Sequence, residues 1–83
     1  MSPERQLRAN LRLALKECAR RDFDLTGFDV GKPREIHAKA SALVTKYPRA
    51  SADAVALVTL ARAARMLADE RGAALGVDPE ATK

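Results

Sequence analysis

The chain has 83 residues, of which 47% are hydrophobic and 31% charged, and its formal net charge is +4. This length allows one domain near the lower limit of what a single hydrophobic core can stabilise, and it leaves no room for the large parallel sheets on which many enzymes are built. Alanine accounts for 17 residues and buries little area, so the larger apolar side chains, Met66 included, must supply the core.

The cellular location is predicted from the start of the chain and from its apolar runs. The first residues, MSPER, do not resemble a secretory signal, and no run reaches the roughly 18 apolar residues of a membrane span. The only cysteine, Cys18, cannot form an intrachain disulfide and lies on an apolar helix face, where a small buried side chain is expected. We therefore expect a soluble, cytoplasmic protein that does not bind membranes.

The first predicted helix covers residues 3–21, with Ser2 as its cap and Pro3 in its first turn. Its apolar side chains recur every three or four residues and predict one buried seam: Leu7, Leu11, Ala14 and Cys18. Nearly opposite, five positive side chains fall within an arc of about 120° and form what we call the basic stripe: Arg5, Arg8, Arg12, Lys16 and Arg20. The stripe is our candidate contact for an anion or a nucleic acid; the alternative is a solvated face that keeps the protein soluble.

Residues 22–32 are predicted to form a loop, because two glycines and three aspartates oppose helix formation. Four apolar side chains in this loop need cover, so we expect it to fold down onto the bundle with these side chains as plugs: Phe23, Leu25, Phe28 and Val30. A two-stranded hairpin around Thr26-Gly27 is the alternative.

The same loop contains two patterns that are associated with chemistry. Asp22, Asp24 and Thr26 spell the D-x-D-x-T string of aspartate-nucleophile phosphatases, which present it at the end of a parallel strand in a much larger α/β domain. The stretch also begins like a calcium loop, but its twelfth position is Pro33 instead of a bidentate Glu. We therefore expect the aspartates to make turn and cap hydrogen bonds, and we expect no metal site.

The second predicted helix covers residues 33–47, with Pro33 in its first turn and Pro48 ending it. Its apolar seam is Ile36, Ala40, Leu43 and Tyr47. The third predicted helix covers residues 52–72 and has Ser51 as its cap. Beyond Arg62 this helix is amphipathic, and Arg65 with Asp69 is expected to form an ion pair one turn apart.

The first half of the third helix is apolar on almost every side. One face is formed by Leu57, Leu60, Ala64 and Leu67, whereas Val55 and Val58 point away from it. Such a helix must be covered all round, so either it is the central helix or part of it meets another chain. We expect a homodimer with Val55 and Val58 in the contact. The overall expectation is a small all-α three-helix bundle, with one domain at 1–76 and a frayed tail at 77–83.

No pattern in the chain predicts an active site. His37 is the only histidine and is expected to be partly exposed, and neither a nucleophile–base pair nor a phosphate-cradling glycine loop is found in the sequence. A helix-turn-helix is disfavoured, because the opening turns of the third helix offer Ala and Val where base-reading side chains are needed. We therefore expect no enzyme, no catalytic residue, no cofactor and no small-molecule substrate.

Two function classes remain open from the sequence. The first is a small non-enzymatic regulatory or adaptor protein that binds another macromolecule, for which we expect a protein partner, through its helical surface. The second is an accessory protein that contacts nucleic-acid phosphates through the basic stripe, with Lys32, Arg34 and Lys39 as further contacts. The sequence ranks the adaptor slightly ahead.

Overall fold

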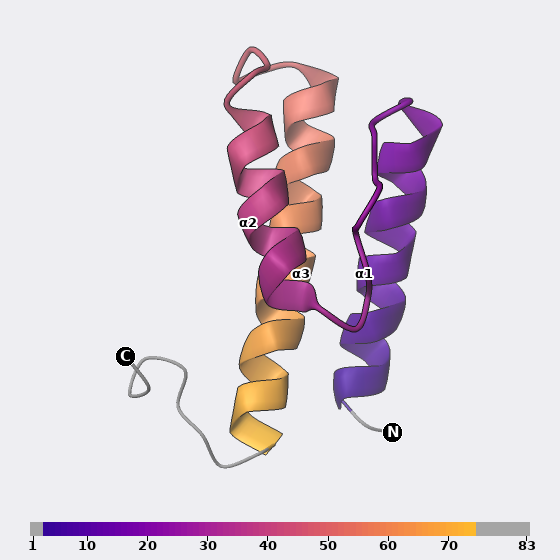
Figure 1. Ribbon diagram of the computed structural model, residues 1–83, viewed down its shortest axis with the longest axis vertical. Helices are drawn as coiled ribbons and strands as arrows, with labels where there is room; N and C mark the ends of the chain where they lie inside the picture. The colour runs from indigo at the N-terminus through magenta and orange to yellow at the C-terminus, as the bar shows by residue number, and fades with distance from the viewer. Residues whose placement is uncertain (1–2, 75–83) are drawn as a thin grey trace.

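The computed structural model describes residues 3–74 and is a bundle of three helices: α1 (Pro3–Arg20), α2 (Pro33–Val44) and α3 (Ala52–Ala74) (Figure 1). Residues 3–74 contain no strand, so the predicted all-α three-helix fold is confirmed and the hairpin alternative at Thr26-Gly27 is not formed. The predicted domain end at residue 76 and the predicted tail at 77–83 lie outside the described residues.

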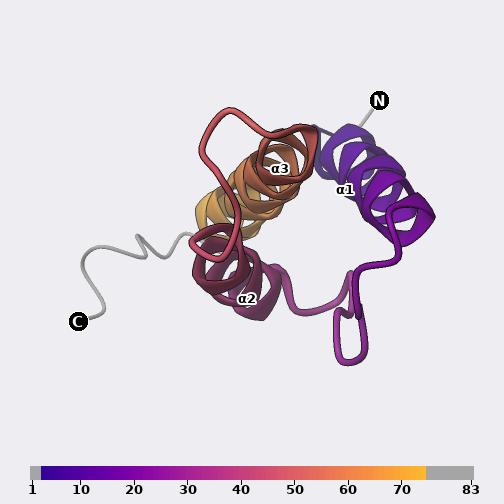
Figure 2. The same ribbon diagram turned by 90° about the horizontal axis from the view of Figure 1, so that it is seen from above.

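α3 is the central helix of the bundle. α1 and α2 each pack along α3 but not against each other, and the loop that joins them runs between them (Figures 1 and 2). Because α3 lies between α1 and α2, its face with Leu57 and Leu60 is covered, and both side chains are fully buried. It does not cover Val55 and Val58, which remain 57% and 44% exposed.

The core combines a few large side chains with many alanines. The largest fully buried side chains come from all three helices: Leu11, Cys18, Ile36, Leu57, Leu60 and Leu67. Five alanines are also buried: Ala14, Ala40, Ala54, Ala64 and Ala68. The prediction that Met66 contributes to the core is wrong, since its side chain is 49% exposed. Met66 follows Val55 by three helical turns, so both lie on the outer side of α3.

Residues 21–32, which we call the connecting loop, fill the space between α1 and α2. Its apolar side chains, Phe23, Leu25, Phe28 and Val30, are partly buried against the core. The Phe23 ring meets the Tyr47 ring edge to face, with centroids 5.3 Å apart. Asp24 Oδ1 accepts hydrogen bonds from the backbone N and Oγ1 of Thr26, and Asp29 Oδ1 accepts one from the backbone N of Gly31. Asp24 and Asp29 therefore have the predicted role in turns.

The helix ends follow local chemistry. The Ser51 hydroxyl accepts a hydrogen bond from the backbone N of Ala54 and caps α3 as predicted. α2 ends at Val44, three residues before the predicted end. Beyond Val44 the backbone forms 3₁₀-type turns, in which the N–H groups of Lys46 and Tyr47 donate to the carbonyls three residues before them. Pro48 disfavours helical geometry at Tyr47, which explains why the regular helix stops early. No helix within 3–74 is both long and apolar enough to cross a membrane.

Candidate nucleic-acid interface

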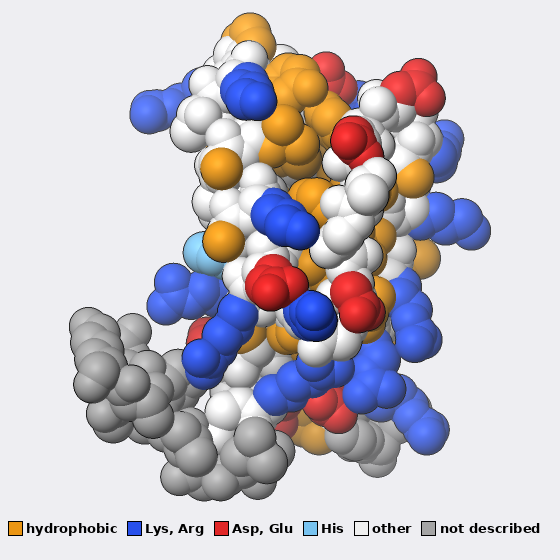
Figure 3. All heavy atoms as spheres, in the orientation of Figure 1, with side chains coloured by type: hydrophobic (Ala, Val, Ile, Leu, Met, Phe, Trp, Pro, Cys, Tyr) orange, Lys and Arg blue, Asp and Glu red, His pale blue; other side chains and the backbone are white. Residues whose placement is uncertain are grey.

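α1 holds the basic stripe on the side away from its buried residues. Leu11, Ala14 and Cys18 are buried, whereas four of the five stripe residues are exposed and Arg8 is half-buried. With a rise of 1.5 Å per residue, the stripe extends about 22 Å along the helix. In Figure 3, Lys and Arg side chains gather along the edge formed by α1 and over the lower part of the same face. The predicted stripe therefore lies on the solvent-facing side of α1.

Two members of the stripe have acidic partners. Arg8 Nη2 donates to Glu4 Oε2 at 3.1 Å, and Arg20 Nη1 donates to Glu17 Oε2 at 3.2 Å. The Nε of Arg8 is shielded from solvent and has no hydrogen-bond partner in the described part of the chain. Within residues 3–74 no ion pair forms at the other three members, Arg5, Arg12 and Lys16.

Arg71 joins three parts of the chain at one end of the bundle. Its Nε lies 2.7 Å from Glu4 Oε1, and its Nη1 donates to the carbonyl of Gly31 at 3.0 Å. The start of α1, the end of α3 and the end of the connecting loop therefore meet here. Sequence reasoning missed this contact, because Glu4 and Arg71 are 67 residues apart and no local pattern links them.

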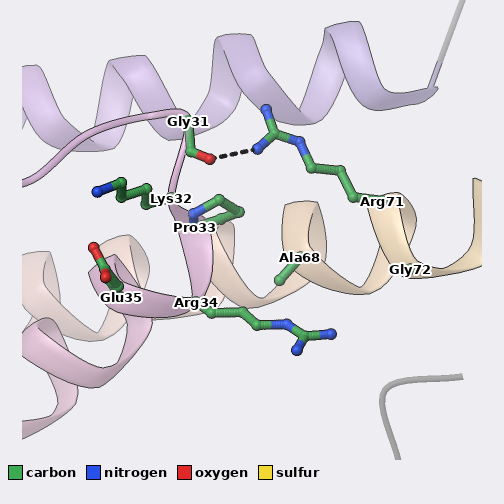
Figure 4. A pocket seen from close by; sticks show the side chains of 8 residues that line it. All are labelled: Gly31, Lys32, Pro33, Arg34, Glu35, Ala68, Arg71 and Gly72. Carbon is green, nitrogen blue, oxygen red and sulfur yellow. Dashed lines mark hydrogen bonds between the residues drawn. The ribbon is translucent and has the colours of Figure 1, made fainter. Parts of the chain in front are cut away.

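A hollow of about 500 Å³ lies beside this junction, at the start of α2 (Figure 4). Its lining residues come from the loop end, α2 and α3: Gly31, Lys32, Pro33, Arg34, Glu35, Ala68, Arg71 and Gly72. The guanidinium groups of Arg34 and Arg71 lie on either side of Ala68, whereas the side chains of Lys32 and Glu35 point away (Figure 4). Of the further nucleic-acid contacts expected from the sequence, Lys32 and Arg34 are thus exposed near Arg71.

Lys39, the third expected contact, has another role. Its Nζ donates to the carbonyl of Gly27 at 3.3 Å and lies 5.8 Å from the centre of the Phe28 ring. The ammonium group therefore holds the tip of the connecting loop.

A second hollow, of about 440 Å³, lies between α1 and α3. Its lining residues are mostly apolar: Ala14, Glu17, Arg21, Ala52, Val55, Ala56 and Thr59. Of the two predicted self-association residues, Val55 is in this lining and Val58 is not. Arg21 in this lining pairs with Glu17 at 3.5 Å and with Asp53 at 3.3 Å.

The remaining groups with potential chemistry are separate from one another. His37 is half-buried on α2, as expected. Cys18 is fully buried, and this burial raises the pKa of its thiol, with a smaller contribution from the charge of Glu17. Among residues 3–74, no three His, Cys, Asp or Glu side chains gather in a group that could hold a metal ion.

Comparison with known proteins gives no relative: no family model, no curated protein and no solved structure matches the chain.

Proposed function

We propose that the protein is a non-enzymatic accessory protein that contacts the phosphates of duplex nucleic acid through the basic stripe. The observation that carries this proposal is the row of exposed cations on α1, of which Arg5, Arg12 and Lys16 form no ion pair within residues 3–74. A row of like charges repels itself, and phosphates relieve this repulsion while releasing condensed counterions. On this ground we favour nucleic-acid binding over the adaptor role that the sequence ranked first.

The rigidity of α1 also supports phosphate contact. Leu11 and Cys18 are fully buried and fix the helix against the bundle. The backbone of α1 is therefore already ordered, and binding carries no entropy cost for forming the helix. Arg and Lys side chains bind phosphate oxygens without reading base edges. We therefore expect binding that tolerates any duplex sequence.

Fluorescence anisotropy with short duplexes of two unrelated sequences tests the proposal between about 50 and 200 mM salt. Three phosphate contacts give a slope of about −2.7 in a plot of log affinity against log salt, because each contact contributes about −0.9. The double variant Arg12→Ala/Lys16→Ala should flatten this slope by about 1.8 and weaken binding to both sequences equally. Both side chains are exposed, so the variant should keep its fold.

Lys46→Ala/Arg49→Ala is the matched control. It removes the same charge from two exposed positions in the turn between α2 and α3 and should leave the slope close to that of the parent protein. An equal loss in both variants would show that net charge matters and the stripe does not. No binding even at low salt would end the nucleic-acid proposal.

A regulatory or adaptor protein is the second candidate. The observation in its favour is that large apolar side chains are exposed on α1 and α3, with Leu13 at 66% and Met66 at 49%. This role predicts no duplex affinity beyond the weak, non-specific binding of basic proteins, with Kd of about 1–100 µM at physiological salt. The two double variants above distinguish the candidates, because weak general binding should respond equally to both charge removals, whereas binding through the basic stripe should respond only to Arg12→Ala/Lys16→Ala.

A further inference from the structure

The hollow at the start of α2 combines an apolar base with two cationic groups. Among its lining residues, Pro33, Ala68 and Gly72 are buried, so the deepest part of the hollow is apolar. The guanidinium groups of Arg34 and Arg71 lie on either side of Ala68 (Figure 4). The volume of about 500 Å³ falls within the range of about 300–1,000 Å³ that is usual for small-molecule sites.

Arg71 is fixed in position and still has a free donor. Its Nε and Nη1 donate to Glu4 and to the carbonyl of Gly31, whereas its Nη2 makes no hydrogen bond within residues 3–74. Glu4 is shared with Arg8, so two positive side chains face one carboxylate and leave a net charge of +1 in this cluster. Because the guanidinium group is already held in place, it loses little conformational freedom when it pairs with an anion.

Arg34 supplies the second cation of the hollow. Its side chain is exposed and forms no ion pair in the part of the chain that the structure describes. Glu35 is the only acidic residue of the lining, and its carboxylate points away from the hollow (Figure 4). α2 also begins here without a side-chain cap, so the positive end of its dipole adds to the attraction for an anion. The charges around the hollow therefore favour a negatively charged ligand.

We propose that the hollow at the start of α2 binds a phosphate monoester with a small apolar body. The phosphate group carries a charge of about −1.5 to −2 at neutral pH, which matches two guanidinium groups, whereas a carboxylate carries only one charge. Guanidinium groups bind phosphate oxygens through paired N–H donors, and the apolar body packs on Ala68 and Pro33. This site goes beyond the proposed function, since it involves neither the basic stripe nor a nucleic acid. The sequence does not predict it, because the lining residues come from separate parts of the chain.

An NMR titration of the isotope-labelled full chain with phenyl phosphate, without nucleic acid, tests the inference. We expect a Kd of about 1 mM, which is reasonable for so small a ligand. The largest shifts of backbone amide signals should occur at Gly31, Arg34 and Gly72, which line the hollow. Inorganic phosphate lacks the apolar body and benzoate lacks the second charge, so each should bind at least about threefold more weakly than phenyl phosphate.

Arg34→Gln should weaken phenyl phosphate binding at least about threefold, because it removes one of the two cations from an exposed position and leaves the fold intact. Arg49→Gln is the matched control, since it removes the same charge from the turn beyond the other end of α2 and should leave the affinity unchanged. Arg12→Ala/Lys16→Ala should also bind phenyl phosphate like the parent protein, so a failure of the proposed function would not affect this result.

Four outcomes would overturn the inference. They are no binding at about 10 mM phenyl phosphate, equal affinity for all three probes, amide shifts that spread along α1 without a maximum at the hollow, and an equal loss of affinity in Arg34→Gln and Arg49→Gln. The last two would show that phosphate is attracted by the net charge of the protein and not by the hollow.

Discussion

Asp22 adopts a backbone conformation that is rare for any residue other than glycine. Its φ is 62°, and the hydrogen bonds around it form a Schellman motif: the backbone N of Asp22 donates to Ala19, and that of Phe23 donates to Cys18. Cys18 belongs to the buried core and Phe23 packs against it, so the motif directs the connecting loop back onto the bundle. Asp22 is strained in this role, and its negative charge lies at the negative end of the helix dipole.

The substitution Asp22→Gly should therefore stabilise the protein by about 0.5–1 kcal/mol. This value includes the opposing effect of glycine, which has more conformational freedom in the unfolded chain. Thermal unfolding should show a rise in Tm of a few degrees. Asp22→Asn removes the charge but keeps a side chain, and we expect it to recover only part of the gain. If Asn gives the full gain, the dipole and not the backbone is the cause.

At the scale of the helices, the contacts of Arg71 connect parts of the chain that helix packing does not bring together. α1 and α2 do not pack against each other, and Arg71 ties α3 to both the start of α1, through Glu4, and the loop that leads into α2, through Gly31. Its side chain is 25% exposed, so these hydrogen bonds are less screened by water than those of a surface pair.

Arg71→Ala should lower the free energy of unfolding by about 1–2 kcal/mol, because it leaves the Gly31 carbonyl and Glu4 with one partner fewer. Arg65→Ala is the control on the same helix: its Nε lies 3.8 Å from Asp69 and the side chain is 59% exposed, so we expect a change below about 0.5 kcal/mol. Urea unfolding of the two variants measures the difference. Similar values for both would mean that Arg71 is only another surface cation.

At the scale of the whole molecule, stability depends on very few large side chains. Six of them are fully buried, and alanine fills much of the remaining core. Since alanine buries little area, each of the six carries an unusually large share of the hydrophobic stabilisation. α3 supplies three of these side chains, which follows from its central position between α1 and α2.

Leu60→Ala should therefore cost about 2–5 kcal/mol, a large part of the 5–15 kcal/mol that holds a typical domain together. Leu13→Ala is the matched control, because the same atoms are removed from a side chain that is 66% exposed, and it should change stability by less than about 0.5 kcal/mol. Chemical denaturation at one low protein concentration keeps self-association from affecting the comparison. A mild effect of Leu60→Ala would mean that the core rearranges to fill the gap.

Helical spacing predicted most of the side chains that are buried in α1 and on the inner face of α3, although Leu7 of the predicted seam is only partly buried. Leu11, Cys18, Leu57 and Leu60 are buried where their spacing places them. The exposed stripe on α1 was predictable for the same reason, since the face opposite a buried seam must face water. Ser51 was predictable as a cap from local chemistry alone, because its partner, the backbone N of Ala54, is three residues away.

Contacts between distant parts of the chain were not predictable in this way. Glu4 links two distant parts of the chain, because it pairs with the stripe residue Arg8 and also accepts a hydrogen bond from Arg71. Met66 was expected in the core because large apolar side chains are scarce, but its place on the outer side of α3 exposes it. The composition gives the amount of apolar surface in the chain, but it does not determine which face of each helix is buried.

The sequence by itself determined the number and the approximate extent of the helices, their buried seams and the basic stripe, because these depend on the spacing of side chains within a few turns. Only the tertiary structure decided that α3 is central, that Lys39 holds the connecting loop, and that Arg71 joins Glu4 to Gly31. It also decided that Val55 lines the hollow between α1 and α3 and that Leu13 is exposed. These features depend on how the helices pack. The packing energy comes from contacts between side chains that are far apart in the sequence.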